Sequence, residues 1–308
     1  MIDNTQLTTF QACPEKYRLR FVEQIKRIPD GPESLAYMFG QGLHAGLASY
    51  YSYKPLNVAN MVSAFKQSYK VSVPSGEQLY RVENATKLLS RYPAYAAANE
   101  QEWKVLDVER MLEIELDGVS FVVKPDLIVE TPAGIYSVDH KSTQKKLGEL
   151  YWRSFEPNSQ VSAQVVAVKR VYGQCAGTII NVLQMGFSKK AELFEEGNSD
   201  SEKYADQEIR YSKYYGKEMV YASGFWCSFQ RQEFNRSVEQ LEDWKRNQLL
   251  WIERVAQSTK TGLYGKNEQQ CGWCEYRDLC VSCGDQQVRD SLYEPYEALE
   301  YLKPEGVE

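Results

Sequence analysis

Long apolar runs are missing from this chain of 308 residues, and none approaches the roughly 20 residues that a membrane-spanning helix needs. Residues 1–6 contain neither a basic region nor an apolar core, so we expect no secretory signal and no membrane partner. We therefore expect the protein in a reducing, cytoplasmic compartment. There, an odd set of seven cysteines is better explained by metal ligands and core thiols than by a disulfide framework.

A Walker loop, G-x-x-x-x-G-K-[ST], is also absent, so the chain encodes no nucleotide-driven motor. The net charge of −6 argues against a nucleic-acid partner on average, because such proteins usually present a basic surface. Two local basic runs differ from this average, although each could be a solvated surface. They comprise Lys16, Tyr17, Arg18, Arg20, Phe21, Lys26 and Arg27, and then Lys141, Lys145 and Lys146.

The stretch 121–143 predicts a β-hairpin, because the turn residues Thr-Pro-Ala-Gly at 131–134 separate two apolar, β-branched runs. If the turn is centred between residues 132 and 133, residues whose numbers sum to 265 face each other. Asp126 then lies opposite Asp139. Side chains alternate between the two faces, so Lys141 shares the face of Asp139, and His140 points to the other face.

Two carboxylates directly opposite each other on a sheet repel, at a cost of a few tenths to roughly 1 kcal/mol. A hard divalent cation, Mg²⁺ or Mn²⁺, between Asp126 and Asp139 would remove this repulsion. Lys141 would then orient a water molecule or offset charge on a phosphate. The alternative is that these side chains form the solvated face of a half-buried hairpin. The spacing alone supports both interpretations.

The elements around this hairpin also follow from apolar periodicity. Residues 45–100 are predicted as a helical layer, and a period of two over Val108–Leu116 and Val119–Val123 predicts a second hairpin. Further along the chain the pattern predicts an amphipathic helix at Ser159–Tyr172, a strand at Thr178–Met185 and a long helix at Gln230–Lys260.

Near the carboxyl end, Cys271, Cys274 and Cys280 have the spacing C-x-x-C-x-x-x-x-x-C. Thiols so spaced can wrap a metal or a cluster, but a closed site needs a fourth ligand, from Cys13 or Cys283. Four thiolates suit structural zinc and an iron-sulfur cluster equally by number. Unrelated free thiols are the third interpretation.

The other cysteines have different surroundings. Cys13 precedes Pro14, which disfavours helical geometry in the residue before it. We therefore expect the first helix to bend there and to present the Cys13 thiol outward. Cys175 and Cys227 lie in apolar, strand-like sequence and are expected in the core.

An ordered set of motifs resembles the PD-(D/E)XK nuclease superfamily in its RecB-like branch. The cysteines extend the resemblance, because Cys13 in the context L-x-x-F-x-x-C-P, with a distant C-x-x-C-x-x-x-x-x-C, resembles the iron-sulfur staple of AddB-type and CRISPR-adaptation nucleases. In those family members a four-iron, four-sulfur (4Fe-4S) cluster ties the two chain ends together. The nuclease motifs, in order, are Gly40-x-x-x-His44, Pro125-Asp126, Asp139-His140-Lys141 and Gln160.

The resemblance implies an α/β fold with a restriction-endonuclease-like core, in which helices flank a central mixed sheet. It implies that His44, Asp126, Asp139 and the backbone carbonyl of His140 coordinate the catalytic Mg²⁺ or Mn²⁺. Lys141 would orient the attacking water or stabilise charge in the transition state.

The resemblance also assigns supporting residues. Gln160 would help to fix Lys141 or the phosphate. The iron-sulfur ligands would be Cys13, Cys271, Cys274 and Cys280.

Three positions depart from the family pattern. The tyrosine usual four residues after the glutamine is Gln164 here. Position 139 is aspartate where glutamate is commoner, and Cys283 adds a further thiol near the implied cluster.

The implied organisation is a nuclease domain at 1–260 with a helical insertion at about 45–100, a cluster-binding segment at 261–285 that closes onto Cys13, and a tail at 286–308. The implied activity is a metal-dependent DNA nuclease that degrades single-stranded ends in recombination, repair, or phage- or CRISPR-type processing. A helicase or an integrase would be its partner, and aromatics near Tyr17 and Trp152 would stack unpaired bases. The rival interpretations are a non-catalytic DNA-binding module of the same fold and a zinc-stapled scaffold protein.

Overall fold

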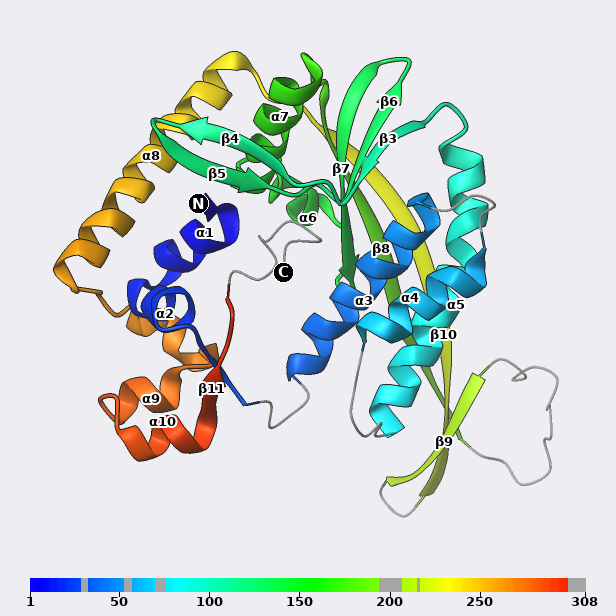
Figure 1. Ribbon diagram of the computed structural model, residues 1–308. Coiled ribbons are helices and arrows are strands. Elements are labelled where there is room, and N and C mark those ends of the chain that lie inside the picture. The colour runs from blue at the N-terminus through cyan, green and yellow to red at the C-terminus, as the bar shows by residue number, and fades with distance from the viewer. Residues whose placement is uncertain (29–32, 53–56, 70–75, 194–206, 215–216, 299–308) are drawn as a thin grey trace.

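A central six-stranded sheet organises the computed structural model, with strands in the order β3-β6-β7-β8-β10-β9 and helices on both faces (Figure 1). The structure describes residues 1–28, 33–52, 57–69, 76–193, 207–214 and 217–298, with the backbone alone at 33–36, 76–80, 187–193, 207–214 and 217–225. The sheet is mixed, because β7 and β8 are parallel and the other neighbours antiparallel. Its strands are β3 (Lys104–Val108), β6 (Leu127–Thr131), β7 (Gly134–Thr143), β8 (Gly177–Leu193), β9 (Gln207–Tyr214) and β10 (Lys217–Phe234).

The central hairpin, β6 and β7, has the predicted register. Leu127 lies opposite Val138, and Thr131 lies opposite Gly134 across the tight turn. Both pairs sum to 265, so the next pair outward is Asp126 and Asp139. The predicted faces are also confirmed: Ser137 bonds to Thr178 on one side of the sheet, whereas Val138 packs against Tyr51 on the other.

Helix α7 (Ser159–Tyr172) connects β7 to β8 and covers one face of the sheet. The Asn158 carboxamide caps its first turn, and Gly173, with a φ of 78°, ends it in the left-handed conformation that glycine tolerates. The bounds are those predicted from the sequence. A short helix, α6 (Glu149–Arg153), precedes α7, so both lie on the path from the end of β7.

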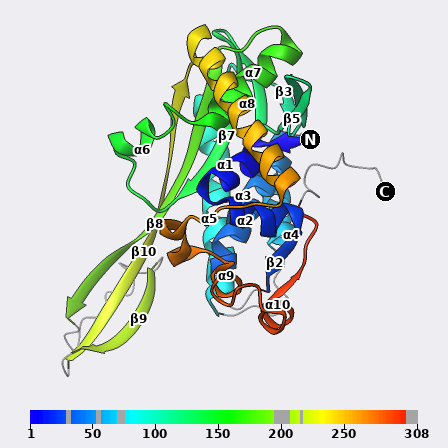
Figure 2. The same ribbon diagram turned by 90° about the vertical axis from the view of Figure 1, so that its left-hand side faces the viewer.

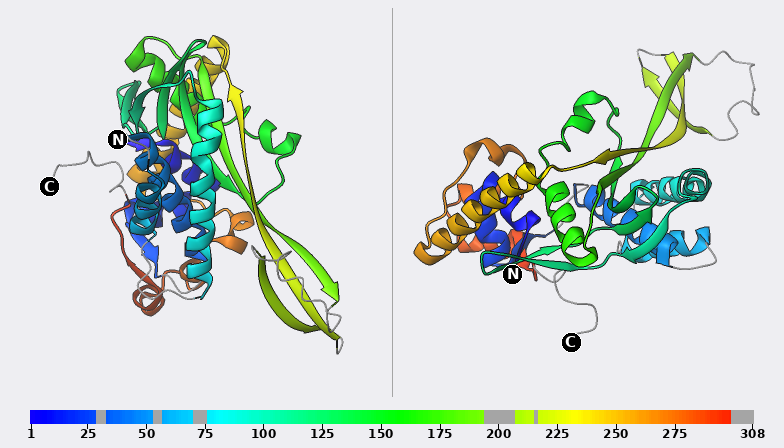
Figure 3. Two further views of the ribbon diagram at one scale, coloured as in Figure 1. Left: turned by 90° about the vertical axis from the view of Figure 1, so that its right-hand side faces the viewer. Right: turned by 90° about the horizontal axis from the view of Figure 1, so that it is seen from above.

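The helical layer predicted at about 45–100 consists of α3 (Glu33–Ser52), α4 (Val58–Ser68) and α5 (Gly76–Asn99) and covers the opposite face (Figure 3). A Cβ atom at Gly42 would lie 2.8 Å from the Phe65 ring, and one at Gly46 would lie 3.0 Å from Leu89. These two glycines therefore allow α3 to approach its neighbours closely, which fixes the position of His44 between them.

Strands β8 and β10 continue past the body as a long ribbon that carries β9 at its far end (Figure 2 and Figure 3). The strand predicted at Thr178–Met185 lies inside β8, which is longer than expected. The helix predicted from Gln230 is wrong in its first turns. Residues up to Phe234 belong to β10, and helix α8 (Val238–Thr261) begins only after the capping box of Ser237 and Gln240.

The two chain ends pack together at one side of the molecule. Tyr276 donates a hydrogen bond from its hydroxyl to the Ile25 carbonyl at 2.7 Å and is fully buried. The amino-terminal elements are β1 (Ile2–Asp3), α1 (Asn4–Ala12), α2 (Pro14–Tyr17), a π-helical turn (Arg18–Val22) and β2 (Ile25–Arg27). The carboxyl-terminal elements after α8 are a 3-10 helix (Glu268–Trp273), α9 (Arg277–Val281), α10 (Gln286–Leu292) and β11 (Tyr293–Pro295), which pairs with β2.

The hairpin predicted before the central one is shorter than expected. It consists of β4 (Leu112–Leu116) and β5 (Val119–Val123), and β1 pairs with β5. The period of two over Val108–Leu116 predicts one strand, but the chain turns at Glu109, whose φ is 51°. Val108 therefore ends β3 in the main sheet, and Leu112 begins β4 in a separate one.

Candidate active site

Asp126 lies at the centre of a group of polar residues where β6 begins. Its Oδ2 accepts a hydrogen bond from the backbone N–H of His140 at 2.6 Å, which ties it to β7. Its Oδ1 lies 3.1 Å from Nδ1 of His44, which α3 supplies from the helical layer. The structure thus brings together residues that are 82 positions apart, from His44 to Asp126.

The ion pair between His44 and Asp126 shifts the pKa of both groups. Burial alone would lower the pKa of His44, but the charge and hydrogen bond of Asp126 outweigh it and raise that pKa to about 9. Burial alone would raise the pKa of Asp126, but His44 outweighs it and lowers that pKa to about 2. Before a cation binds, the imidazole is thus the positive partner of a carboxylate that stays ionised, and it must release this proton to coordinate a metal.

Asp139 and Lys141, on the face of β7 toward α7, form a second pair. Lys141 Nζ lies 2.7 Å from Asp139 Oδ2 and donates to Gln160 Oε1 at 3.3 Å. Gln160 Nε2 donates to Asp139 Oδ1 at 2.8 Å, so one carboxamide from α7 fixes both charged groups. Gln164, one turn further on, donates to the same Asp139 oxygen at 3.4 Å.

The electrostatics of this pair are set by burial and mutual attraction. Burial would lower the pKa of Lys141, yet the Asp139 charge outweighs it and raises that pKa, so the ammonium is charged at neutral pH. Burial raises the pKa of Asp139 despite the attraction of Lys141, and repulsion from Asp126 adds to the rise. The two aspartates are therefore close enough to repel each other, as the register predicts.

The side chain of His140 faces away from this group. Its Nδ1 lies 2.8 Å from the Asn181 carboxamide nitrogen, and its ring stacks on Tyr51 with the centroids 5.9 Å apart. Burial lowers its pKa to about 3, so the imidazole is neutral. Only the backbone of His140 is therefore placed to act beside Asp126 and Asp139.

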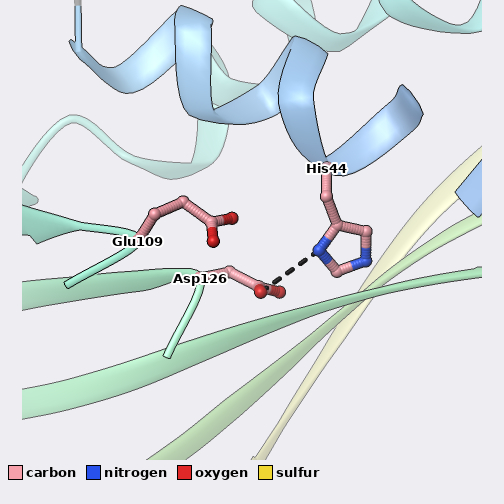
Figure 4. A group of neighbouring side chains, drawn as sticks. All are labelled: His44, Glu109 and Asp126. Atoms are coloured by element: carbon pink, nitrogen blue, oxygen red, sulfur yellow. Dashed lines mark ion pairs between the residues drawn. The ribbon is translucent and has the colours of Figure 1, made fainter. Parts of the chain in front are cut away.

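Glu109 also lies in this group, and the sequence pattern did not single it out. The ligand atoms of Glu109, His44 and Asp126 all lie within 4.8 Å of one another (Figure 4). Two consecutive charged residues, Glu109 and Arg110, interrupt the period of two, and this interruption was the available signal. Carboxylate oxygens with one imidazole are donors that suit Mg²⁺ and Mn²⁺, so this group fits a divalent cation.

The basic run near the amino terminus is paired with acidic side chains of the chain itself. Lys16 lies 3.1 Å from Glu275, and Lys26 lies 3.1 Å from Glu294. Tyr17 and the neighbouring Phe21 are each only 7% exposed, so the expectation that aromatics near Tyr17 stack unpaired bases is wrong. The interpretation of this run as a solvated surface is therefore favoured over a nucleic-acid contact. In the second basic run, Lys145 and Lys146 are exposed near the end of β7.

The structure brings Cys13 next to the carboxyl-terminal cysteines. Asn267 contacts two of these thiols. Its backbone N–H lies 3.5 Å from the Cys13 thiol, and its carbonyl lies 3.9 Å from Cys271 Sγ. Burial raises the pKa of Cys274 and of Cys280, and the nearby Cys13 thiol contributes to both shifts. Cys13 is 8% exposed, so the prediction that its thiol points outward is wrong.

The two remaining groups of thiols differ in exposure. Cys283 is exposed, with its Sγ 4.0 Å from the Val281 carbonyl. Cys175 and Cys227 are partly buried, and each packs against a hydrophobic core cluster, as expected from their sequence context.

None of the helices in the described part of the chain has the length and apolar character needed to cross a membrane. No curated protein sequence matches the chain. A solved structure named "Putative exonuclease", from Eubacterium rectale, is similar with a TM-score of 0.49 and 10% identity, covering 92% of this chain and 93% of that one. The structure of SSO0001 is similar with a TM-score of 0.30 and 12% identity, covering 80% and 84% of the two chains.

The family comparison covers nearly the whole chain. The model of the PD-(D/E)XK nuclease superfamily matches residues 4–281. The matched region includes the central hairpin, the α3 histidine and the α7 glutamine. The chain therefore belongs to the PD-(D/E)XK nuclease superfamily and is an enzyme that hydrolyses phosphodiester bonds.

Proposed function

We propose that this nuclease is a metal-dependent deoxyribonuclease that degrades DNA from single-stranded ends. The observation that supports the proposal is a set of two neighbouring ion pairs, Asp126 with His44 of α3 and Asp139 with Lys141, in which the two aspartates are the next cross-strand pair of the β6–β7 register. A module that only bound DNA would not need to keep both carboxylates and the lysine in this arrangement.

Each residue has a distinct task in this proposal. His44, Asp126, Asp139 and the His140 carbonyl would hold a divalent cation, which supplies charge stabilisation and lowers the pKa of an attacking water. Gln160 fixes Lys141 through its carboxamide oxygen and Asp139 through its nitrogen. Lys141 then presents a fixed positive charge to the phosphate oxygens as negative charge develops on them.

The substrate assignment rests on the surface near the active site and on the family resemblance. Lys145 and Lys146 are exposed just beyond β7 and would attract the DNA backbone. Trp152 in α6 is half-buried against Phe155, which leaves part of its ring to stack a base. We further propose a role in recombination, repair, or phage- or CRISPR-type processing, beside a helicase or an integrase that supplies the opened strands.

The proposal is tested with single-stranded and duplex DNA labelled at either end, incubated with cluster-loaded protein and Mn²⁺, Mg²⁺ or EDTA. We expect cation-dependent loss of single-stranded DNA, with the label released as short products from one end. Cleavage of duplex interiors would contradict the end dependence. Metal-dependent DNA binding without any cleavage would instead favour the non-catalytic module.

We also propose that Cys13, Cys271, Cys274 and Cys280 hold a 4Fe-4S cluster that staples the chain ends. The proposal rests on the family resemblance and on the packing of Cys13 beside the segment that carries the other three thiols, where the Asn267 backbone N–H lies 3.5 Å from the Cys13 thiol and the Asn267 carbonyl lies 3.9 Å from Cys271 Sγ. Four thiolates suit zinc equally by number, so the visible absorption distinguishes the two metals.

Replacing Cys274 with alanine tests the staple. We expect loss of the broad absorption near 400 nm and a decrease of about 2–4 kcal/mol in the free energy of unfolding, as for a cross-link that closes a long loop. Urea unfolding of the purified variant measures the change. The exposed Cys283→Ala variant is the matched control and should keep both the colour and the stability. Equal stability of Cys274→Ala and the natural protein would remove the staple proposal.

A further inference from the structure

Glu109 occupies an unusual position beside the proposed active site. It follows the last residue of β3 and adopts the left-handed conformation, with a φ of 51°, which disfavours side chains larger than glycine. Its backbone N–H donates to the Asp126 carbonyl at 3.0 Å, so the bend is tied to the aspartate. Figure 4 shows the result: the Glu109 carboxylate points toward Asp126 and His44.

The donors around this carboxylate suit a divalent cation. Glu109 and Asp126 place two carboxylates beside the His44 imidazole, with one ligand atom of each residue within 4.8 Å of the others. Two carboxylates and an imidazole that has lost its proton carry two negative charges, which a divalent cation neutralises.

Lys124 offers a purely structural explanation for Glu109. Its Nζ lies 3.1 Å from Glu109 Oε2, with 38% of the lysine side chain and 27% of the glutamate side chain exposed. Partly exposed ion pairs of this kind contribute little to stability. A weak pair does not explain why a non-glycine residue holds the left-handed conformation that aims its carboxylate at Asp126.

We propose that Glu109 is a further protein ligand of the cation that His44 and Asp126 hold. The inference deepens the proposed function and rests on it. One ligand atom of each of Glu109, His44 and Asp126 lies within 4.8 Å of the others, so this trio can bind the cation before DNA arrives, with Asp139 as the additional ligand of the proposed function. A donor set that includes imidazole favours Mn²⁺ over Mg²⁺, because Mg²⁺ prefers oxygen ligands and retained water.

The test measures Mn²⁺ binding by cluster-loaded protein without DNA, from the decrease in the electron paramagnetic resonance signal of free Mn²⁺. Glu109→Gln should weaken binding by at least about tenfold, since it removes a charged ligand and keeps the side-chain size. Glu113→Gln, an exposed carboxylate on β4, is the matched control and should bind as the natural protein does.

Lys124→Met separates the two explanations. If Glu109 is a ligand, removing its lysine partner frees the carboxylate, and Mn²⁺ should bind at least as tightly as before. If Glu109 only pairs with Lys124, Lys124→Met should behave like Glu109→Gln. Unchanged Mn²⁺ binding by Glu109→Gln would overturn the inference but leave the proposed function intact, provided that the natural protein cleaves DNA. Absence of Mn²⁺ binding by the natural protein would count against both.

Discussion

Lys141→Ala is expected to lower the single-turnover rate of DNA cleavage by about 10²–10³-fold, the usual effect of removing one group that stabilises developing charge. The ammonium is held by Asp139 at 2.7 Å and by Gln160 at 3.3 Å, so its position is fixed before the substrate binds. Cleavage of labelled single-stranded DNA with enzyme in excess measures the effect without a contribution from product release.

The matched control for this prediction is Lys169→Ala. Lys169 is exposed in the last turn of α7, at the other end of that helix from Gln160. We expect its rate to stay within about threefold of the natural rate, as for most surface substitutions. The absorption of the cluster per chain shows whether each variant is folded. A Lys141→Ala rate within tenfold of the natural rate would remove Lys141 from the proposed catalytic group.

The second large effect is expected from Arg231→Ala, on stability. Arg231 forms a buried ion pair with Glu100, and the two side chains are 13% and 9% exposed. Its guanidinium also lies over the rings of Tyr95 and Trp103, with 4.7 Å and 4.4 Å to their centroids. Removing it leaves the Glu100 charge buried without its cation, which costs about 3–5 kcal/mol.

Urea unfolding of Arg231→Ala measures this cost. Arg246→Ala, which breaks an exposed pair with Asp243, is the matched control and should change stability by less than about 0.5 kcal/mol. The double variant Arg231→Met with Glu100→Gln removes both charges and should recover a large part of the loss. A loss below about 1 kcal/mol in Arg231→Ala would show that the buried pair is not needed for the fold.

Arg231 also bears on the active site through Asn181. Its Nε donates to Asn181 Oδ1 at 2.9 Å, and the Asn181 nitrogen lies 2.8 Å from His140 Nδ1. The backbone N–H of His140 in turn bonds to Asp126. A continuous set of buried hydrogen bonds thus connects the helical layer to the strand that carries the proposed ligands.

The central hairpin was predictable because its register depends on local information. A tight turn at 131–134 and two β-branched strands leave one pairing, and the positions of Asp126, Asp139 and Lys141 follow from it. Helix α7 was predictable for a similar reason, since its cap at Asn158 and its end at Gly173 are both local signals.

Contacts between distant segments were not predictable from periodicity. The bend at Glu109 needs a positive φ, and no glycine at that position indicates one. The period of two therefore predicts a single strand there. The burial of Tyr17 depends on packing against Phe10 and Phe21 under the β4–β5 hairpin, which the sequence does not specify. His44 became an expectation only through the family resemblance, which also favoured Cys13 over Cys283 as the partner of the distant cysteines.

The most direct test of the central claim is cleavage of single-stranded DNA in water enriched in oxygen-18, with cluster-loaded protein and Mn²⁺, followed by mass spectrometry of the products. If the site hydrolyses phosphodiester bonds, each new terminal phosphate should carry one solvent oxygen. EDTA or Asp126→Asn should abolish the products. Products without solvent oxygen, or cleavage that survives Asp126→Asn, would contradict metal-dependent hydrolysis at this site.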